Sequence, residues 1–480
     1  MEYDWVAIVF LPILFLMLFA YIRSMGRYWW WLSTSNIVIY YLAALLISTF
    51  VIGADFEHGI YWFNTVVLGT TALIAGCLFA SLRNGVTTYK LAHNFYNKPI
   101  DHMFSKRSLV LVWGILVFGT IVIVLYLKAI QGNVFMNIVK EGIAVNSINV
   151  VDIRKKAVYG SGFGSGDYMA AGYVMQFRSF LLPIIMLVCL GHYFMQRRKK
   201  FYLLCLIVIS GLISTFANGA TGQRGTFCTP FIICAYLCFI SYYCKPSQFS
   251  KKTQMKFKAI FITSLVLGFT FFGILTFALG RKGHSEKKNA NLINVAVNLT
   301  SRIFIVPVEK DLEAIEILKE YPPSLGRNYI QGILKVLPNQ IEHRITKNWS
   351  EVGTSNWLHV QHGGSKEGNA PLNLWGAFWF NFRLPGVLIG GFIVGFLCQC
   401  YDRWSFKRRK TVLSVVCWQF GAISLALASS LGQILLTGFA AAMMLLWLNG
   451  LFERGILANM ASKHISHNKD MSVQLQHTKH

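Results

Sequence analysis

Runs of apolar residues long enough to cross a lipid bilayer recur along this chain, and they restrict its fold more than any other feature. A helix needs about 20 mostly apolar residues to cross the hydrocarbon core. Eleven such segments are visible, at 5–24, 35–54, 61–82, 108–129, 172–195, 201–217, 226–243, 259–280, 373–400, 411–428 and 434–452. A single segment in lipid satisfies its backbone hydrogen bonds as a helix. The sequence therefore predicts an all-α polytopic membrane protein in which residues 1–480 form a single membrane domain.

Positive charge is unevenly distributed, and its pattern predicts how the helices are oriented. The 480 residues carry a formal net charge of +25, although only 14% of them are charged. More than half of the lysines and arginines lie in alternate loops and in the tail, at 23–27, 83–107, 197–200, 245–258, 403–410 and 453–480. Cytoplasmic loops carry such an excess of Lys and Arg. We therefore expect the N-terminus outside, the C-terminus inside, and residues 453–480 as a cytoplasmic tail.

The same charge does not predict a nucleic-acid partner, because the basic residues form no continuous surface interleaved with aromatic side chains. The ten cysteines all lie inside or at the ends of apolar runs. Their positions fit neither an extracytoplasmic disulfide framework nor the spacing of thiolate metal ligands.

In this orientation two sizeable loops are extracytoplasmic, residues 130–171 and residues 281–372. The larger loop has apolar residues at helical spacing and holds most of the acid/base and anion-binding groups. Within it we expect a helix over Asp311–Glu320, with Asp311 as its N-cap, ended by the two prolines after Tyr321. A second short helix is expected over 329–337. The fold prediction is thus a helical bundle with a large helical extracytoplasmic loop.

Three arginines are candidates for binding an anion. Arg224 lies in the glycine-rich turn Asn218-Gly-Ala-Thr-Gly-Gln-Arg-Gly225, where backbone N–H groups and a guanidinium can approach a phosphate. Arg302 lies in the otherwise apolar segment Leu299–Pro307, and Arg178 falls about one turn inside the fifth apolar segment. Charge within a membrane helix usually faces a cavity. The structural alternatives are snorkelling of Arg178 and Arg224 to headgroups, and pairing of Arg302 with Glu309.

Several groups in the large loop could accept a proton. His359 and His362 have i, i+3 spacing before a Gly-Gly turn and suit a base or a substrate hydrogen bond, or are solvated loop residues. Metal binding would need a third ligand that the sequence does not place. Glu309 and Asp311 are rival bases. Asn369 and Asn373 are candidates for the polar wall of the pocket.

The order of these features resembles the Wzy-type O-antigen and capsule polymerases. The resemblance rests on Gly222-Gln-Arg-Gly225, Ser301-Arg-Ile-Phe with Pro307, Tyr321-Pro-Pro-Ser-Leu-Gly-Arg-Asn-Tyr329, Gly363-Gly-Ser365, and Asn373-Leu-Trp with Asn381-Phe-Arg-Leu-Pro-Gly386. These matches cover about 170 residues of the C-terminal half, whereas the N-terminal half matches only in hydropathy. Lys366-Glu-Gly368 departs from the shorter, less charged turn expected there, which affects how His362 is presented.

The resemblance implies a GT-C-like glycosyltransferase of the bacterial inner membrane that joins undecaprenyl-diphosphate-linked repeat units on the outer face. A hydroxyl of one repeat would attack the anomeric carbon of the other chain, with inversion, and undecaprenyl diphosphate would leave. Arg224, Arg302, Arg327 and Arg178 would bind the diphosphate with help from His359 and Asn369, and His362 or Glu309 would be the base. No metal or other cofactor is expected. The expected partners are the lipid-linked glycans, the bilayer, a chain-length regulator and a flippase.

Three alternatives remain open from the sequence. An O-antigen ligase would use similar arginines with a different acceptor. A lipid-linked oligosaccharide flippase or other transporter would place charges along the helices and often has paired broken helices, whereas here the helix interiors carry few charges beyond Arg178 and Arg383. The third alternative is an assembly protein without chemistry.

Overall fold

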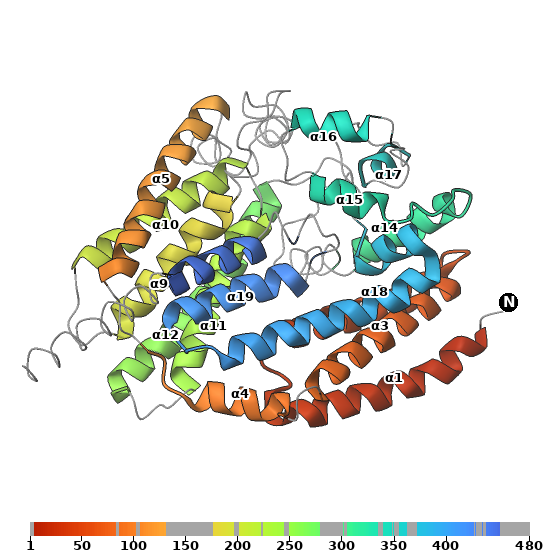
Figure 1. The fold of residues 1–480 in the computed structure, drawn as a ribbon, viewed down its shortest axis with the longest axis horizontal. Coiled ribbons are helices and arrows are strands. Elements are labelled where there is room, and N and C mark those ends of the chain that lie inside the picture. The colour runs from red at the N-terminus through yellow and green to blue at the C-terminus, as the bar shows by residue number, and fades with distance from the viewer. Residues whose placement is uncertain are drawn as a thin grey trace, which may run out of the picture.

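The computed structural model is helical throughout the part of the chain that it describes, which is residues 4–82, 86–101, 106–130, 176–195, 201–221, 224–243, 249–278, 301, 305–334, 339–347, 349, 355–361, 372–426, 428, 434 and 438–451. The first helices are α1 (Asp4–Met25), η1 (Gly26–Tyr28), α2 (Thr34–Gly53), α3 (Gly59–Leu82), α4 (Thr88–Asn97), α5 (Lys106–Ile130), η3 (Phe177–Leu181), α9 (Leu182–Met195) and α10 (Phe201–Thr221). They are followed by α11 (Arg224–Tyr243), α12 (Lys251–Ala278), α14 (Val306–Leu318), α15 (Arg327–Leu334), α16 (Asn339–Thr346), α17 (Ser355–Gln361), α18 (Leu374–Lys407), α19 (Val412–Ala426) and a last helix, Gly438–Leu451. Figure 1 shows their arrangement.

Within the described ranges, six helices are long and apolar enough to cross a membrane: Val9–Tyr28, Thr34–Gly53, Gly59–Leu82, Phe177–Met195, Phe201–Asn218 and Leu374–Lys407. Four apolar helices are shorter: Leu109–Leu125, Cys228–Tyr242, Val412–Ala426 and Gly438–Leu451. The prediction of a helical membrane protein is confirmed at this level. The number of eleven crossings and the orientation stay predictions.

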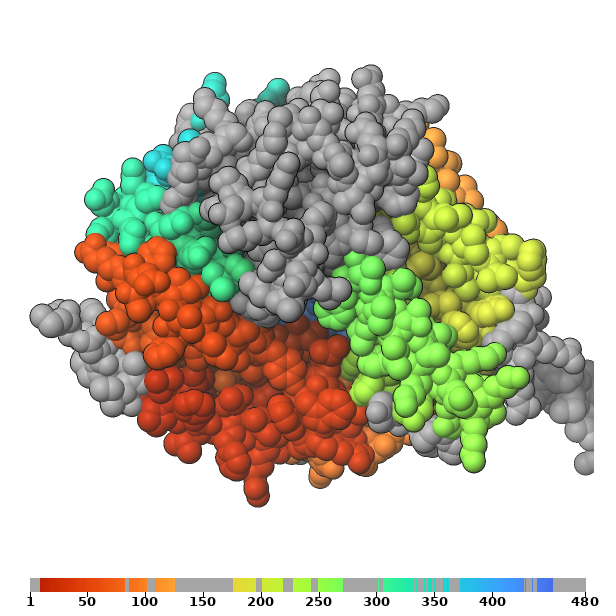
Figure 2. Space-filling model, turned by 180° about the vertical axis from the view of Figure 1, so that it is seen from behind, coloured from red at the N-terminus to blue at the C-terminus, as the bar shows by residue number. Residues whose placement is uncertain are grey.

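The outward-facing surfaces of these helices are apolar, as contact with lipid requires. Phe15, Leu16 and Phe19 of α1 are each more than 60% exposed, and Phe269 of α12 is 67% exposed. The N-terminal helices (red to orange) and α11 and α12 (green) form neighbouring parts of one face in Figure 2.

Among the described helices, α3 and α18 make the most extensive contact, and small residues bring the two backbones together. A Cβ at Gly395 would overlap the backbone oxygen of Leu73, and a Cβ at Gly76 would overlap that of Phe392. Within membranes, such small residues drive helix association through close packing. Figure 1 shows the two helices side by side along much of their length.

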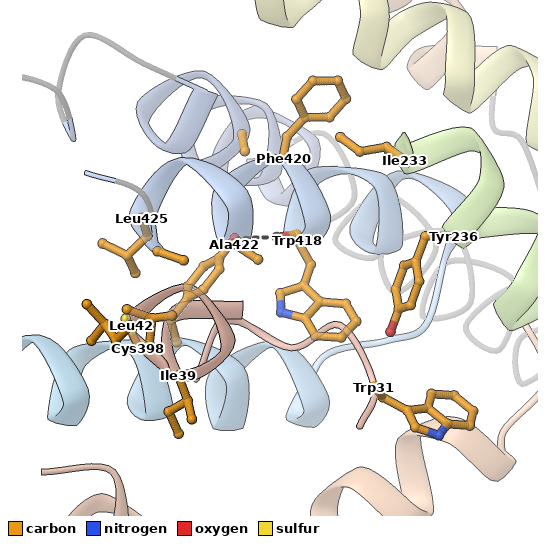
Figure 3. Packing of buried hydrophobic residues seen from close by; sticks show 14 of the residues in the cluster. Trp31, Ile39, Leu42, Ile233, Tyr236, Cys398, Trp418, Phe420, Ala422 and Leu425 are labelled. Carbon is orange, nitrogen blue, oxygen red and sulfur yellow. Dashed lines mark hydrogen bonds between the residues drawn. The ribbon is translucent and has the colours of Figure 1, made fainter. Parts of the chain in front are cut away.

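The main core joins helices from distant parts of the sequence. Trp418 of α19 is 1% exposed and lies among Ile39 and Leu42 of α2, Cys398 of α18 and Tyr236 of α11 (Figure 3). The first helices and the last ones therefore form one packed unit.

Helix α18 is broken near its start, which differs from the continuous segment 373–400 expected from hydropathy. Arg383 has φ 57° and ψ −149°, a conformation that non-glycine residues rarely adopt. Pro385 comes two residues later and lacks the N–H that a continuous helix needs. The stretch 374–382 folds back on the part of α18 beyond Pro385, since a Cβ at Gly390 would overlap the Phe378 ring. The helix therefore begins inside the bundle, where Trp375 is fully buried.

Arg383 also ties this break to α14. Its guanidinium donates to the backbone oxygens of Leu318 (3.0 Å) and Tyr321 at the end of α14, and its Cζ lies 4.1 Å from the centre of the Trp379 ring. These contacts satisfy carbonyl groups that the end of a helix leaves without partners. They also hold Arg383 in its unusual backbone conformation.

Candidate functional site

Three of the residues predicted for the site, Arg302, His362 and Asn369, lie outside the described residues. Two others are described by their backbone alone: Arg224 is the first residue of α11, and His359 lies within α17. The turn predicted over Asn218–Gly225 is shorter in the structure, because α10 extends to Thr221 and α11 begins at Arg224. The remaining candidates, Arg178, Arg327 and Glu309, are described in full.

Arg178 lies in η3, a single π-helical turn that leads into α9. It is 4% exposed, so its side chain is enclosed by protein rather than extended to headgroups as the snorkelling alternative required. Two side chains of α10 hold its backbone: Ser214 Oγ and Asn218 Nδ2 donate to the Arg178 oxygen at 3.1 and 3.0 Å. Single π-turns inside α-helices often occur at functional sites.

The same contacts bring two predicted arginines to one end of the bundle. Asn218 lies in the last turn of α10, and Arg224 begins α11 directly after the connecting turn. Because Asn218 binds the Arg178 backbone, positions 178 and 224 belong to one neighbourhood even though 46 residues separate them in the sequence. Arg327, by contrast, begins α15 and is exposed.

Asp311 does not begin its helix, so the N-cap prediction is wrong. Helix α14 starts at Val306, because Pro307 occupies a first-turn position for which its fixed φ is suited. Asp311 lies in the middle of this helix and has no exposed surface. Its Oδ1 instead accepts a hydrogen bond from the backbone N–H of Asn373 at 3.1 Å, at the start of α18.

Asn373, a candidate for the pocket wall, is the N-cap of α18. Its Oδ1 accepts from the backbone N–H groups of Trp375 (2.8 Å) and Gly376 (3.1 Å). Together Asp311 and Asn373 satisfy three N–H groups at the positive end of this helix. Gly376 makes their approach possible, because a Cβ there would overlap the Asp311 carboxylate.

The electrostatic environment of Asp311 is unusual for a carboxyl group. Burial raises its pKa well above the ordinary value, and the nearby Asn373 backbone and side chain offset this only in part. Its Oδ2 has no hydrogen-bond partner, and neither has the Nδ2 of Asn373. Perturbed carboxyl groups of this kind concentrate at functional sites. Glu309, two residues earlier on α14, is half-buried and points from another face of the helix.

Sequence reasoning missed a second buried polar cluster, at the opposite end of α18. Asp402 has no exposed surface and accepts from Thr34 N (2.8 Å), Ser35 N (2.9 Å), Ser35 Oγ (2.9 Å) and Trp418 Nε1 (3.1 Å). It caps the start of α2 from a helix more than 360 residues away in the sequence. All its contacts are internal to the fold, so its role is structural.

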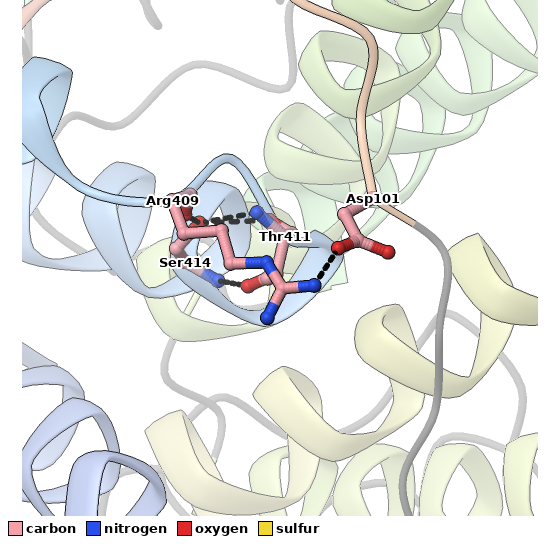
Figure 4. A network of polar contacts seen from close by, with 4 residues as sticks. All are labelled: Asp101, Arg409, Thr411 and Ser414. Atoms are coloured by element: carbon pink, nitrogen blue, oxygen red, sulfur yellow. Dashed lines mark hydrogen bonds and ion pairs between the residues drawn. The ribbon is translucent and has the colours of Figure 1, made fainter. Parts of the chain in front are cut away.

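Two basic residues counted as part of a cytoplasmic loop are also buried. Arg403 donates to the Ser81 oxygen at 2.8 Å, and Lys410 Nζ donates to the oxygens of Phe95 (2.9 Å) and Lys98 (2.9 Å) at the end of α4. They are 6% and 4% exposed. The neighbouring Arg409 is on the surface, where it pairs with Asp101 while Ser414 and Thr411 hold the turn (Figure 4). Part of the positive charge on which the predicted orientation rests is therefore buried and structural.

Comparisons with known proteins add no assignment to this geometry: no family model matches the chain, and no curated protein or solved structure is significantly similar to it. In the ranges that the structure describes, no group of three His, Cys, Asp or Glu side chains is placed to bind a metal ion. Among the described residues, the buried Arg178 is a candidate for binding an anion, and the buried Asp311 is a candidate for exchanging a proton.

Proposed function

We propose that this chain is a glycosyltransferase that polymerises oligosaccharide repeat units carried on undecaprenyl diphosphate. The observation that carries the proposal is the burial of Arg178 in a π-turn, next to the α10–α11 turn where Arg224 begins a helix. An arginine inside an apolar helix is costly and usually serves a function. The sequence resemblance supplies the reaction class, and this pair of arginines supplies the chemistry that the reaction needs.

The leaving group explains why arginines are required. When the glycosidic bond forms, undecaprenyl diphosphate departs with additional negative charge on its phosphate oxygens. A guanidinium can bind two phosphate oxygens at once, and it acts more strongly in a buried site than in water. Arg178 and Arg224 would bind this diphosphate, with Arg302 and the exposed Arg327 as further candidates. The energy comes from the diphosphate linkage, so no nucleotide is needed.

The proposal includes a topology of eleven crossings with the N-terminus outside. Among the described residues, most exposed lysines and arginines lie at the α4 end, which supports a cytoplasmic position for that end. The α14–α17 end would then be extracytoplasmic, on the side where lipid-linked repeats are polymerised in the bacterial inner membrane. A chain-length regulator and a flippase would be its partners there.

Complementation of a source strain that lacks this chain tests the proposal. We expect Arg178→Ala to lower the amount of long surface glycan about a hundredfold, because one charge-stabilising donor is lost, and single repeats should remain on the acceptor lipid. Arg178→Lys should restore only part, since lysine cannot bind two oxygens in the same fork geometry. Arg23→Ala, an exposed arginine at the end of α1, is the control. Normal glycan length in Arg178→Ala cells with normal protein levels contradicts the diphosphate site at Arg178 and removes the structural support for the proposal.

Transport of the same lipid-linked glycan is a second candidate, and the break in α18 favours it. Transporters use discontinuous helices whose inner ends face the substrate, and α18 begins inside the bundle beside the buried Asp311. The two functions differ in the deletion strain. Loss of a polymerase leaves single repeats on the outer face, whereas loss of a flippase leaves lipid-linked repeats on the cytoplasmic face and none outside.

A further inference from the structure

The start of α18 contains a pair of buried polar atoms that the fold leaves unused. Asp311 is 0% exposed and Asn373 is 5% exposed. One oxygen of Asp311 and one of Asn373 are bound to backbone N–H groups, but Asp311 Oδ2 and Asn373 Nδ2 have no hydrogen-bond partner. Leaving a buried polar atom unpaired costs about 1–3 kcal/mol. Two such atoms at one helix start therefore point to a group that binds there.

The chemistry of the two atoms identifies that group. Asp311 Oδ2 is an acceptor when ionised, and Asn373 Nδ2 is a donor. The Asn373 side chain lies close enough to Asp311 to lower its pKa, but neither Asp311 Oδ2 nor Asn373 Nδ2 makes a hydrogen bond of ordinary geometry. A hydroxyl group can donate its hydrogen to one and accept from the other. Water has the same capacity, so a ligand hydroxyl and a structural water must be distinguished by experiment.

On the basis of the proposed function, we propose that Asp311 and Asn373 form the site for the acceptor hydroxyl, with Asp311 as the catalytic base. The hydroxyl proton passes to Asp311 Oδ2 while the acceptor oxygen forms a bond to the anomeric carbon of the donor glycan. The bond from that carbon to the phosphate oxygen breaks, and the diphosphate leaves with the electron pair. Asp311 then releases the proton to water.

The surroundings of Asp311 suit proton acceptance. A carboxylate removed from water has a higher proton affinity than an exposed one, because burial destabilises its charged form. Helix α2 presents the phenol of Tyr41 to it, and α18 presents the amide of Asn373 and the helix start. The described residues provide no cation that would hold the carboxylate permanently ionised. Because Asp311 is fully buried, acceptor entry requires the protein to open.

Gly376 is a further sign that this arrangement is specific. A Cβ at position 376 would overlap both Oδ1 and Cγ of Asp311, so glycine is needed for the carboxylate to reach the helix start. The helix would have its N-cap from Asn373 without Asp311. Capping of α18 alone therefore does not explain why the Asp311 carboxyl group approaches the start of this helix.

Turnover by the full-length protein in bilayer vesicles tests this inference, with the lipid-linked repeat extracted from the deletion strain as substrate. Asp311→Asn keeps an oxygen that can accept from Asn373 N but cannot take a proton at neutral pH. We expect turnover to fall about a hundredfold or more, the usual contribution of a general base, with a thermal unfolding midpoint no lower than that of the wild type. Glu316→Gln is the matched control, because it also replaces a carboxyl group of α14 with an amide, and it should keep the wild-type rate.

A second variant keeps the test valid if Asp311→Asn folds poorly. Asn373→Ser retains a side chain that can cap α18 but removes Nδ2, and it should raise the KM for the acceptor about tenfold, the loss of one hydrogen bond. The pH profile gives an independent reading. The wild-type rate should rise with pH through one apparent pKa, Asp311→Glu should shift that pKa, and the residual rate of Asp311→Asn should not vary with it.

The outcomes separate this inference from the proposed function. If the wild-type protein is active and Asp311→Asn turns over within about threefold of the wild-type rate, the change is well below the usual effect of losing a base. That result overturns the hydroxyl site but leaves the polymerase proposal standing. The site then holds a structural water. Loss of turnover in Glu309→Gln with an active Asp311→Asn has the same meaning and assigns the base to Glu309. If the wild-type protein does not join the lipid-linked repeats at all, both proposals fail. If Arg178→Ala is fully active while Asp311→Asn is not, only the diphosphate site is wrong.

Discussion

Asp311 and Asp402 are both fully buried, but their hydrogen bonding differs. Asp402 accepts four hydrogen bonds from Thr34, Ser35 and Trp418, so both of its oxygens are satisfied. Asp311 accepts one, and its second oxygen is unpaired. A buried carboxylate is stable when donors compensate its loss of water. The comparison separates a carboxylate that holds the fold together from one that is available for chemistry.

The structural role of Asp402 predicts a large stability effect. Asp402→Ala leaves the two backbone N–H groups at the start of α2 and the Trp418 indole N–H without their acceptor. At roughly 1–3 kcal/mol for each of these three buried unpaired groups, we expect a loss of about 3–9 kcal/mol in the free energy of unfolding. Unfolding in detergent micelles measures it. Arg409→Ala, which removes a surface ion pair with Asp101, should change stability by less than about 1 kcal/mol.

Asp311 predicts a pH dependence of stability with a definite sign. An unfolded Asp titrates near pH 3.9, whereas burial raises the pKa of Asp311 in the folded protein. Between the two pKa values the folded state holds a proton that the unfolded state has lost, so stability falls as pH rises through this window. Asp311→Asn removes this contribution. The unfolding midpoint of the variant minus that of the wild type should therefore increase with pH from about pH 5 upward. A constant difference across this range contradicts the raised pKa.

At the scale of helices, the apolar runs were enough to place the helices, but not the contacts between them. Hydropathy depends on a local window, so segments such as 61–82 coincide closely with α3. The break at Arg383 and the contact of Asp311 with Asn373 depend on residues more than 60 positions apart. The sequence contained one usable signal for the break, Pro385. The sequence contained no signal for the burial of Asp402, because a charged residue at the end of an apolar run is normally interpreted as the start of a loop.

Helix α4 depends on a lysine from another part of the chain. Lys410 Nζ donates to the oxygens of Phe95, Tyr96 and Lys98 at the C-terminal end of α4, where positive charge is favoured. Lys410→Met keeps the apolar stem and removes these bonds. We expect amide hydrogen exchange in 88–97 to become about tenfold faster or more, corresponding to at least about 1.4 kcal/mol. Lys407→Met, at an exposed position three residues earlier, should leave exchange unchanged.

The contact between α3 and α18 should be intolerant of even one methyl group. Gly395→Ala places a Cβ against the backbone oxygen of Leu73, which cannot move as a side chain can. Overpacking of this kind costs about 1–3 kcal/mol, and it should appear as a lower thermal unfolding midpoint. Gly114→Ala in α5 is the control, because no atom lies near the added Cβ. There alanine should be neutral or stabilising, since it favours helix more than glycine does. Equal effects at both positions would show that helix propensity, not packing, governs Gly395.

For the whole molecule, the two ends of the bundle differ in charge and in construction. The α4 end has exposed lysines and arginines over a buried framework of Asp402, Arg403 and Lys410. The other end carries α14 to α17, the turn between α2 and α3, and the contact of Lys319 Nζ with His58 Nε2 at 3.1 Å. Burial of Arg403 and Lys410 removes two charges from the set that was predicted to face the cytoplasm. The remaining exposed basic residues still favour the same orientation.

That orientation can be measured with single cysteines and a membrane-impermeant maleimide. Glu57→Cys and Glu320→Cys report on the α14 end, and Lys90→Cys and Lys407→Cys on the α4 end; all four positions are exposed. The described native cysteines are buried or half-buried, so the unmodified chain is a suitable blank. If the positive-inside pattern sets the topology, the first pair reacts in intact cells and the second pair only after lysis. The reverse pattern would put the buried carboxyl of Asp311 at the cytoplasmic end. It would thereby exclude polymerisation of glycans that are already on the outer face.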